Sequence, residues 1–230
     1  MARPRRSEQQ LDLQEAIKAT AWKQIGEMGA AALSLRGIAR ELRITAPAIY
    51  NYYPSRDDLM EALVIDAFTS FGDALAAGRD SLPPADLVGR ILTTGDAYYR
   101  WALAYPQRYM LIFGTPLHGF KMTAAVWEVS SRSFMTLVGV VGEAYRAGLL
   151  HLPDHYAEIP PQLEARYRAL GALGIPYDPI VTQVALSMWG RVHGLTSLAL
   201  YGLLPGFIGD QVDSFVRHEL TAIMVFLGLR

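Results

Sequence analysis

The chain has 230 residues, 51% of them hydrophobic and 19% charged, and a mass of 25.4 kDa. It is long enough to bury a sizeable core in one large domain or two small ones. It contains no cysteine, which excludes disulfides, thiolate zinc sites, Fe–S clusters and thiol nucleophiles. The basic start MARPRRSEQQ lacks the apolar core of a signal peptide, so we expect a cytoplasmic protein. The formal net charge of −1 by itself argues against a nucleic acid as partner.

Apolar residues recur at helical spacing along the chain, and no useful segment alternates as a β-strand would. We therefore predict an all-α fold with about nine helices. The first covers about residues 10–30, and its apolar face consists of Leu13, Ile17, Ala21, Ile25 and Met28. Two short helices follow, the first capped by Ser34 and the second by Thr45. Ser55 and Asp58 form a capping pair that opens a fourth helix running towards Gly78.

The segment SLPP at 81–84 marks a break before a larger C-terminal part. There we expect helices over about 87–105, 107–113, 123–146, 179–204 and 209–228. Residues 151–178 are rich in proline, which predicts an irregular insertion with at most one short helix, near 161–172.

The predicted helix 179–204 is apolar nearly all round and carries one formal charge, Arg191. Polar residues on several of its faces argue against a membrane span. A helix of this kind is more simply buried on two sides, by its own core and by a second subunit. Together with the amphipathic helix 209–228 it would form a four-helix interface in a homodimer. An ordinary monomeric core is the alternative.

The two short helices, joined by a tight turn at Arg43-Ile44, match a helix-turn-helix, whose second helix fits the major groove of DNA. Its outward face offers a hydroxyl, a small apolar surface, an amide and a phenol, which suit base edges. Tyr50 and Arg56 can donate to phosphates, and so can Ser34 and Thr45 at the two helix N-termini. On spacing alone, the neighbouring tyrosines could equally be aromatic core.

The run LSLRGIARELRITAPAIYNYYPSRDDLMEALV, with the helix before it, closely resembles the DNA-binding domain of the TetR (tetracycline repressor) family over about residues 10–65. The resemblance implies that the second short helix faces bases and nearby phosphates, and that Tyr50 and Arg56 hold the DNA backbone. The family usually has glycine where this chain has Arg43. If the turn needs a positive φ there, arginine costs about 1 kcal/mol, and in return it adds a cation beside DNA. The predicted DNA-binding residues are Ser34, Arg36, Arg43, Thr45, Ala46, Pro47, Ala48, Tyr50, Asn51, Tyr52 and Arg56.

The segments YPQRYMLIFG and WGRVHGLTSLALYGLL resemble a ligand-binding and dimerisation domain named for its Trp-His-Gly signature, here Trp189, His193 and Gly194. This looser resemblance spans much of 84–228 and implies a dimer that responds to a small molecule. Aromatic and methionine residues on these helices should enclose a common interior that suits a largely apolar ligand. The predicted ligand-binding residues are Tyr98, Trp101, Tyr109, Phe113, Trp127, Phe134, Met188, Trp189 and His193. Each could also be ordinary core, and His193 could be a buried histidine bonded to a backbone carbonyl.

Charge is distributed unevenly along the chain. Residues 1–60 contain nine Lys and Arg against seven Asp and Glu, and the remainder contains twelve against fifteen. The near-zero total therefore does not exclude DNA. Arg3, Arg5 and Arg6 form a basic arm that could follow phosphates or enter the minor groove, or remain a solvated tail.

The sequence offers one candidate for a metal site and none for a catalytic site. His151 and His155 have the spacing of metal ligands, but Pro153 between them disfavours a shared helical face, so we predict no metal site. The chain has no phosphate-binding glycine loop and no nucleophile elbow, and we expect neither a cofactor nor enzymatic activity.

These features predict a ligand-responsive repressor that binds a palindromic double-stranded DNA operator as a homodimer through its last two helices. The expected domains are a DNA-binding domain over 1–55 with its basic arm at 1–9, a connecting helix over 56–80, and a ligand-binding and dimerisation domain over 81–230. The alternative is a helical small-molecule-binding or interaction protein without DNA binding. The small, polar face of the second short helix favours the regulator.

Overall fold

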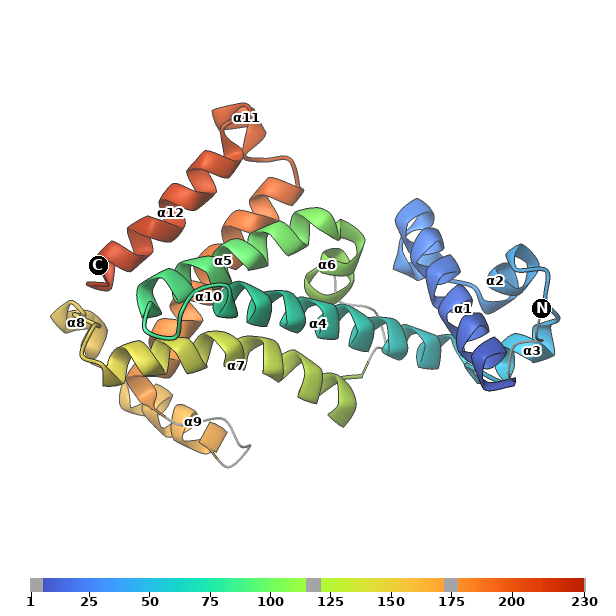
Figure 1. Cartoon of the computed structure of the whole chain (residues 1–230), viewed down its shortest axis with the longest axis horizontal. Coiled ribbons are helices and arrows are strands. Elements are labelled where there is room, and N and C mark those ends of the chain that lie inside the picture. The colour runs from blue at the N-terminus through green and yellow to red at the C-terminus, as the bar shows by residue number, and fades with distance from the viewer. Residues whose placement is uncertain (1–5, 115–120, 172–177, 230) are drawn as a thin grey trace. The chain divides into compact units, whose positions relative to one another are not determined.

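The structure, a computed structural model, describes residues 6–114, 121–171 and 178–229 (Figure 1). Among these residues there is no β-strand, and nine helices have seven or more residues, so the prediction of an all-α fold is confirmed. The chain divides into two compact units. The first comprises Met1–Phe68 and Tyr105–Trp127, and the second comprises Thr69–Ala104 and Glu128–Arg230.

The first unit contains three N-terminal helices, the beginning of a long fourth one, and a short helix from later in the chain. In order these are α1 (Arg6–Met28), the 3-10 turn η1 (Ala30–Ala32), α2 (Leu35–Glu41), α3 (Ala46–Tyr50), the start of α4 (Arg56–Asp80), and α6 (Pro106–Phe113). The core is apolar and includes the fully buried Ile17, Ile38, Ile49, Leu59 and Leu63. The predicted apolar face of α1 is wrong at its end, because Met28 lies in the last turn with 58% of its surface exposed. In the predicted basic arm, Arg6 begins α1, and residues 1–5 lie outside the described residues.

Helix α6 packs within the first unit, although the expected domain boundaries group it with the C-terminal part. The guanidinium carbon of Arg108 lies 5.3 Å from the ring centre of Trp22 on α1 and 5.0 Å from that of Tyr105. On another side of α6, Phe113 meets Phe68 of α4 edge to face, with 5.8 Å between ring centres. Cation–π and aromatic contacts of this kind hold a short helix that would be marginal by itself.

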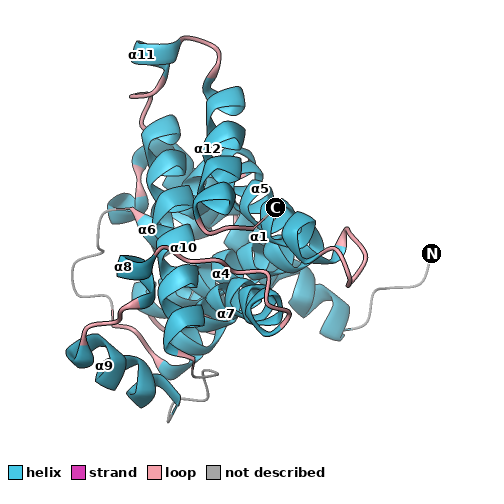
Figure 2. Cartoon of the chain, turned by 90° about the vertical axis from the view of Figure 1, so that its left-hand side faces the viewer, coloured by secondary structure: helices cyan, strands magenta, loops and turns pink. Residues whose placement is uncertain are grey.

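The second unit contains the rest of α4 and the remaining helices: α5 (Leu87–Ala104), most of α7 (Ala124–Arg146), α8 (Asp154–Ala157), α9 (Pro161–Gly171), α10 (Pro179–Leu200), α11 (Pro205–Ile208) and α12 (Val212–Phe226) (Figure 2). Its core is built from the facing sides of α5, α7, α10 and α12. The prediction of at most one short helix in the insertion is wrong. The insertion contains two helices, because the one-turn helix α8 precedes α9. Helix α10 starts at Pro179 after Asp178, whose side chain accepts a hydrogen bond of 3.0 Å from the Val181 amide.

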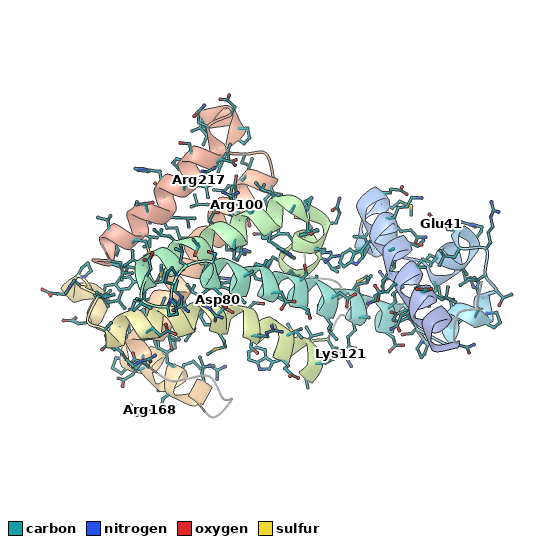
Figure 3. The ribbon with its side chains drawn as sticks, viewed as in Figure 1. Glu41, Asp80, Arg100, Lys121, Arg168 and Arg217 are labelled. Carbon is teal, nitrogen blue, oxygen red and sulfur yellow. The ribbon has the colours of Figure 1, made fainter. Side chains whose placement is uncertain are left out.

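The predicted break at 81–84 is a turn held by Arg90, which is 7% exposed. Its guanidinium donates to the carbonyl oxygens of Arg79 and Pro84, each at 3.3 Å, and to the Glu143 carboxylate at 2.7 Å. The carboxylate of Asp80, labelled in Figure 3, lies 3.7 Å away. A buried arginine is tolerated here because carbonyls and carboxylates surround its donors. The turn thereby joins the end of α4 to α5 and α7.

Candidate functional site

Helices α2 and α3 form the predicted helix-turn-helix. The Ser34 hydroxyl accepts a hydrogen bond from the Gly37 amide at 3.2 Å, which confirms the predicted cap of α2. Leu35, Ile38 and Ala39 on α2 and Ile49 on α3 are buried. The two helices are therefore fixed to each other by apolar packing, and their other faces remain accessible.

The turn between them has a left-handed residue. Arg43 has φ 54°, and it is the one described non-glycine residue with a positive φ. The Ile44 amide reaches back to the Ala39 carbonyl at 3.0 Å, which closes the end of α2 in the way a C-terminal glycine usually does. The position thus requires the conformation that the family's usual glycine adopts without strain.

The second helix, α3, presents a polar face above one buried residue. Ile49 is fully buried, whereas Thr45, Pro47, Tyr50 and Asn51 are exposed. Ala46, Ala48 and Tyr52 are partly exposed, and Ser34, Arg36 and Arg43 are exposed around the turn and α2. Thr45 occupies the N-cap position, but its side chain makes no capping hydrogen bond, so the expected hydroxyl cap is wrong. Pro47 in the first turn sets the backbone of α3 instead.

Arg56 contacts the protein itself. Its guanidinium donates to the carbonyl oxygens of Leu33 at 3.2 Å, Ala30 at 2.9 Å and Ala31 at 3.3 Å. These carbonyls belong to η1 and to the residue before the cap of α2, so Arg56 joins the start of α4 to the start of the helix-turn-helix. This arrangement gives Arg56 a structural role and leaves its phosphate contact as a prediction. Tyr53, by contrast, is 4% exposed and belongs to the core.

The second unit contains an apolar cavity of about 30 Å³. It lies among α4, α5, α7, α10 and α12, and three of the predicted ligand-binding residues, Tyr98, Met188 and Trp189, line it. The rest of the lining is Leu75, Ile91, Leu92, Thr94, Gly95, Leu137, Val192, Leu220, Ile223 and Met224.

An aromatic cluster borders this cavity. Trp189 meets Tyr98, Phe134 and Phe71 nearly edge to face, with ring centres 5.3, 5.5 and 5.8 Å apart. Trp101 lies against Phe71 at 4.8 Å. The Tyr98 hydroxyl shares a hydrogen bond of 2.8 Å with Nδ1 of His193. Six of the nine predicted residues thus lie on or beside one apolar interior within the second unit.

The other three predicted ligand-binding residues belong to the first unit. Tyr109 is buried there and lies 5.2 Å from Phe113 between ring centres, and Trp127 is 45% exposed. The structure thus assigns these three residues to the first unit, and their part in a ligand site stays a prediction. Their helical spacing could not show that the chain passes from one compact unit to the other after Ala104.

Comparisons with known proteins agree with this geometry. A model of the bacterial regulatory proteins of the tetR family matches residues 17–63, and a model of the tetracyclin repressor-like C-terminal domain matches residues 91–223. The chain belongs to the TetR family. The HTH-type transcriptional regulator Rv1816 of Mycobacterium tuberculosis is similar to it, with 29% identity over 184 residues, 78% of this chain and 77% of the relative.

Solved structures of this TetR-family fold are similar as well. The crystal structure of the protein SCO4313 has a TM-score of 0.77 and 30% identity, and the match covers 96% of this chain and 100% of that one. A bacterial regulatory protein in the tetR family from Rhodococcus RHA1 shares the fold, with a TM-score of 0.63, 16% identity, and coverage of 94% and 97%. The family consists of DNA-binding transcriptional regulators, and the chain is therefore a regulator and not an enzyme.

Sequence reasoning missed several residues of the cavity and its aromatic border. Phe71 and Leu75 come from α4, which was interpreted only as a connecting helix. They continue the series Leu63, Ala67, Phe71, Leu75, in which every fourth residue is buried. That spacing could have indicated an apolar stripe along α4. Leu220 lies on the apolar stripe expected for helix 209–228, but that stripe was assigned to the dimer interface, and Gly95, which it faces, gave no such signal.

Two further findings concern a membrane and a metal ion as partners. None of the helices in the described part of the chain is long and apolar enough to cross a membrane. Among the described side chains, no three His, Asp or Glu residues form a group that could hold a metal ion. The side chain of His155 lies outside those described.

Replacing Arg43 by glycine tests the strained turn of this TetR-family chain. We expect Arg43→Gly to raise the free energy of unfolding by about 1 kcal/mol, because glycine adopts a positive φ without steric cost. If Arg43 contacts a phosphate as predicted, operator affinity should fall and its salt dependence should weaken by about one counterion. Thermal denaturation and fluorescence anisotropy measure the two effects. Arg43→Ala removes the charge but keeps the strain, so an equal stabilisation by alanine would contradict the explanation.

The imidazole of His193 should make stability depend on pH. Burial lowers the pKa of His193 below its ordinary value of 6.5, so the folded protein favours the neutral ring. The stability that this preference contributes is present above the unfolded pKa and is lost as pH falls through the folded pKa. Below pH 6.5 the denaturation midpoint should therefore decrease more steeply in the wild type than in His193→Gln. Parallel curves for the two proteins would contradict this role of His193.

Proposed function

We propose that this TetR-family regulator is a repressor that binds a palindromic operator as a homodimer and leaves it when a small, largely apolar effector binds in the second unit. The single observation that carries the DNA-binding assignment is the face of α3. Thr45, Pro47, Tyr50 and Asn51 are exposed there, on a short helix that Ile49 anchors to the core. Hydroxyl, amide and phenol groups on a protruding helix match the donor and acceptor pattern of the major groove.

The homodimer is supported by the outer faces of α10 and α12. Val184 and Met188 are buried on the inner side of α10, whereas Leu186 and Leu198 are 44% and 40% exposed. On α12, Val225 is 54% exposed although its neighbour Met224 is buried. Two copies related by a two-fold axis could bury these faces against each other as a four-helix interface. The DNA-binding units would then be paired, and an operator in the cytoplasm would be read as two half-sites.

The effector response is supported by the apolar cavity and its aromatic border, which lie among the same helices. Met188 and Trp189 of α10 and Met224 of α12 line the cavity. A ligand that binds one arrangement of these helices more tightly than another would shift the equilibrium between them, in proportion to that difference in affinity. Such a shift in a dimer would change the spacing of its DNA-binding units.

Selection of binding sites from random double-stranded DNA tests the proposed function. We expect an enriched inverted repeat whose half-site centres are about 10–10.5 base pairs apart, or a multiple of that, because two recognition helices on one face of DNA need this spacing. Sedimentation analysis should find an even number of chains on each site. A reporter gene placed behind the selected site should be less active when the protein is present. Absence of an enriched sequence, or a single chain on each site, would contradict the proposal.

A further inference from the structure

The charge and polarity of the cavity wall indicate what it can bind. We infer that the cavity among α4, α5, α7, α10 and α12 takes an uncharged, hydrocarbon-rich ligand built on a single small ring. This inference rests on the proposed effector response and deepens it by naming the ligand class. The first observation is that no Asp, Glu, Lys, Arg or His is among the thirteen described residues that line the cavity. An ionised ligand would lose its hydration there without gaining a counter-charge.

The second observation concerns the two hydroxyl groups in the wall. Thr94 donates its hydroxyl hydrogen to the Arg90 carbonyl at 2.7 Å. The Tyr98 hydroxyl shares a hydrogen bond of 2.8 Å with Nδ1 of His193. Both groups thus already have protein partners, and a ligand with several polar groups would have to break these bonds or remain unsatisfied. Affinity must therefore come mainly from the burial of apolar surface.

The third observation is the size of the cavity. About 30 Å³ is less than the roughly 150 Å³ of a cavity that holds benzene, so a ring can enter only if side chains move. Met188 and Met224 are the wall residues best suited to this, because methionine has three rotatable side-chain bonds and fills irregular spaces. The surrounding β-branched side chains, which include Val192 and Ile223, are less adaptable. A ligand much larger than one ring would require the helices to separate widely.

Gly95 is a position at which the cavity can be made smaller without disrupting the fold. A Cβ atom at Gly95 would lie 3.4 and 3.5 Å from the two terminal methyl groups of Leu220. That is an ordinary packing distance, so Gly95→Ala should fold normally while it fills part of the space between α5 and α12. Gly139 on α7 is the matched control, because a Cβ atom there would meet nothing within 4 Å.

Three probes of the same size separate charge from shape: toluene, benzoate and benzylammonium. Titration calorimetry on the DNA-free full-length chain should show saturable binding of toluene. Benzoate and benzylammonium should bind about 100-fold more weakly or not at all, because burying an unpaired charge costs several kcal/mol. Gly95→Ala should weaken toluene binding about 10-fold or more, which is about 1.4 kcal/mol, because the added methyl group occupies space that the ring needs. Gly139→Ala should bind toluene like the wild type.

Binding of either charged probe as tightly as toluene would overturn the inference. So would an absence of toluene binding, or unchanged toluene affinity in Gly95→Ala. The proposed effector response is tested by a separate measurement, the effect of the ligand on operator binding. If toluene binds the cavity with the expected selectivity, and no ligand of this class changes operator anisotropy, the ligand class stands and the effector response is wrong.

Discussion

Replacing Gly78 by alanine is expected to lower the free energy of unfolding by about 1–3 kcal/mol, the largest effect on stability that we predict. Gly78 lies on α4 where that helix crosses α5. A Cβ atom there would lie 2.5 Å from the Cβ of Ala97 and 2.7 Å from the backbone carbonyl oxygen of Thr93. Neither atom is the end of a flexible side chain, so the two helices would have to move apart. Protein interiors are packed as densely as crystals of small organic molecules, so the two helices have little room to move.

The control for this prediction is the same substitution at another helical glycine. Gly139 is exposed on α7, and a Cβ atom there would meet nothing within 4 Å. Gly139→Ala should therefore stabilise the protein by about 0.5–1 kcal/mol, because alanine has the higher helix propensity. Urea denaturation of both variants measures the difference. Equal changes at the two positions would contradict a role for close packing at Gly78.

Replacing Asn51 by alanine is expected to weaken operator binding by about 5- to 150-fold, which corresponds to the 1–3 kcal/mol of a bidentate contact to a base. Asn51 is the C-cap residue of α3, and it is exposed, as are Thr45, Pro47 and Tyr50. An amide can both donate to and accept from a base edge, and alanine can do neither. Because the residue is exposed, stability should change by less than about 0.5 kcal/mol. The measurement is a fluorescence anisotropy titration with the selected operator, together with thermal denaturation.

Gln162→Ala provides the matched control, since it removes an exposed amide from α9 in the other unit. The operator affinity of Gln162→Ala should equal that of the wild type. If Asn51→Ala binds the operator as tightly as the wild type, the assignment of α3 as the recognition helix is wrong. If both variants lose affinity equally, the loss does not report a contact of α3 with DNA.

The sequence was sufficient for the helices and for the DNA-binding motif because both depend on local physics. Helical periodicity reports which face of a helix is apolar, whatever that face packs against. The cap at Ser34 involves residues only three positions apart, so the pattern alone predicts it. The left-handed turn at Arg43 is equally local, but only the resemblance to the TetR family, which usually has glycine there, pointed to it. The same locality explains two errors. The hydroxyl of Thr45 has the right position for a cap but makes no such bond, and Met28 has the right period but lies beyond the edge of the core.

Spacing along the chain could not decide the role of Arg56 or the make-up of the cavity. Arg56 reaches carbonyls more than twenty positions earlier, and only the fold brings them within hydrogen-bonding distance. The cavity joins Leu75, Tyr98, Trp189 and Leu220, which come from four helices.

The sequence by itself therefore determined that this chain is all-helical, that residues 34–53 contain a helix-turn-helix, and which residues are apolar enough to be buried. Only the tertiary structure decided to which compact unit each of those apolar residues belongs. Tyr109 and Tyr98 have the same chemistry and are both almost fully buried, yet they lie in different compact units. Hydrophobic burial is non-directional, so an apolar side chain gains as much in one core as in another. The path of the chain and the packing of its helices make that choice.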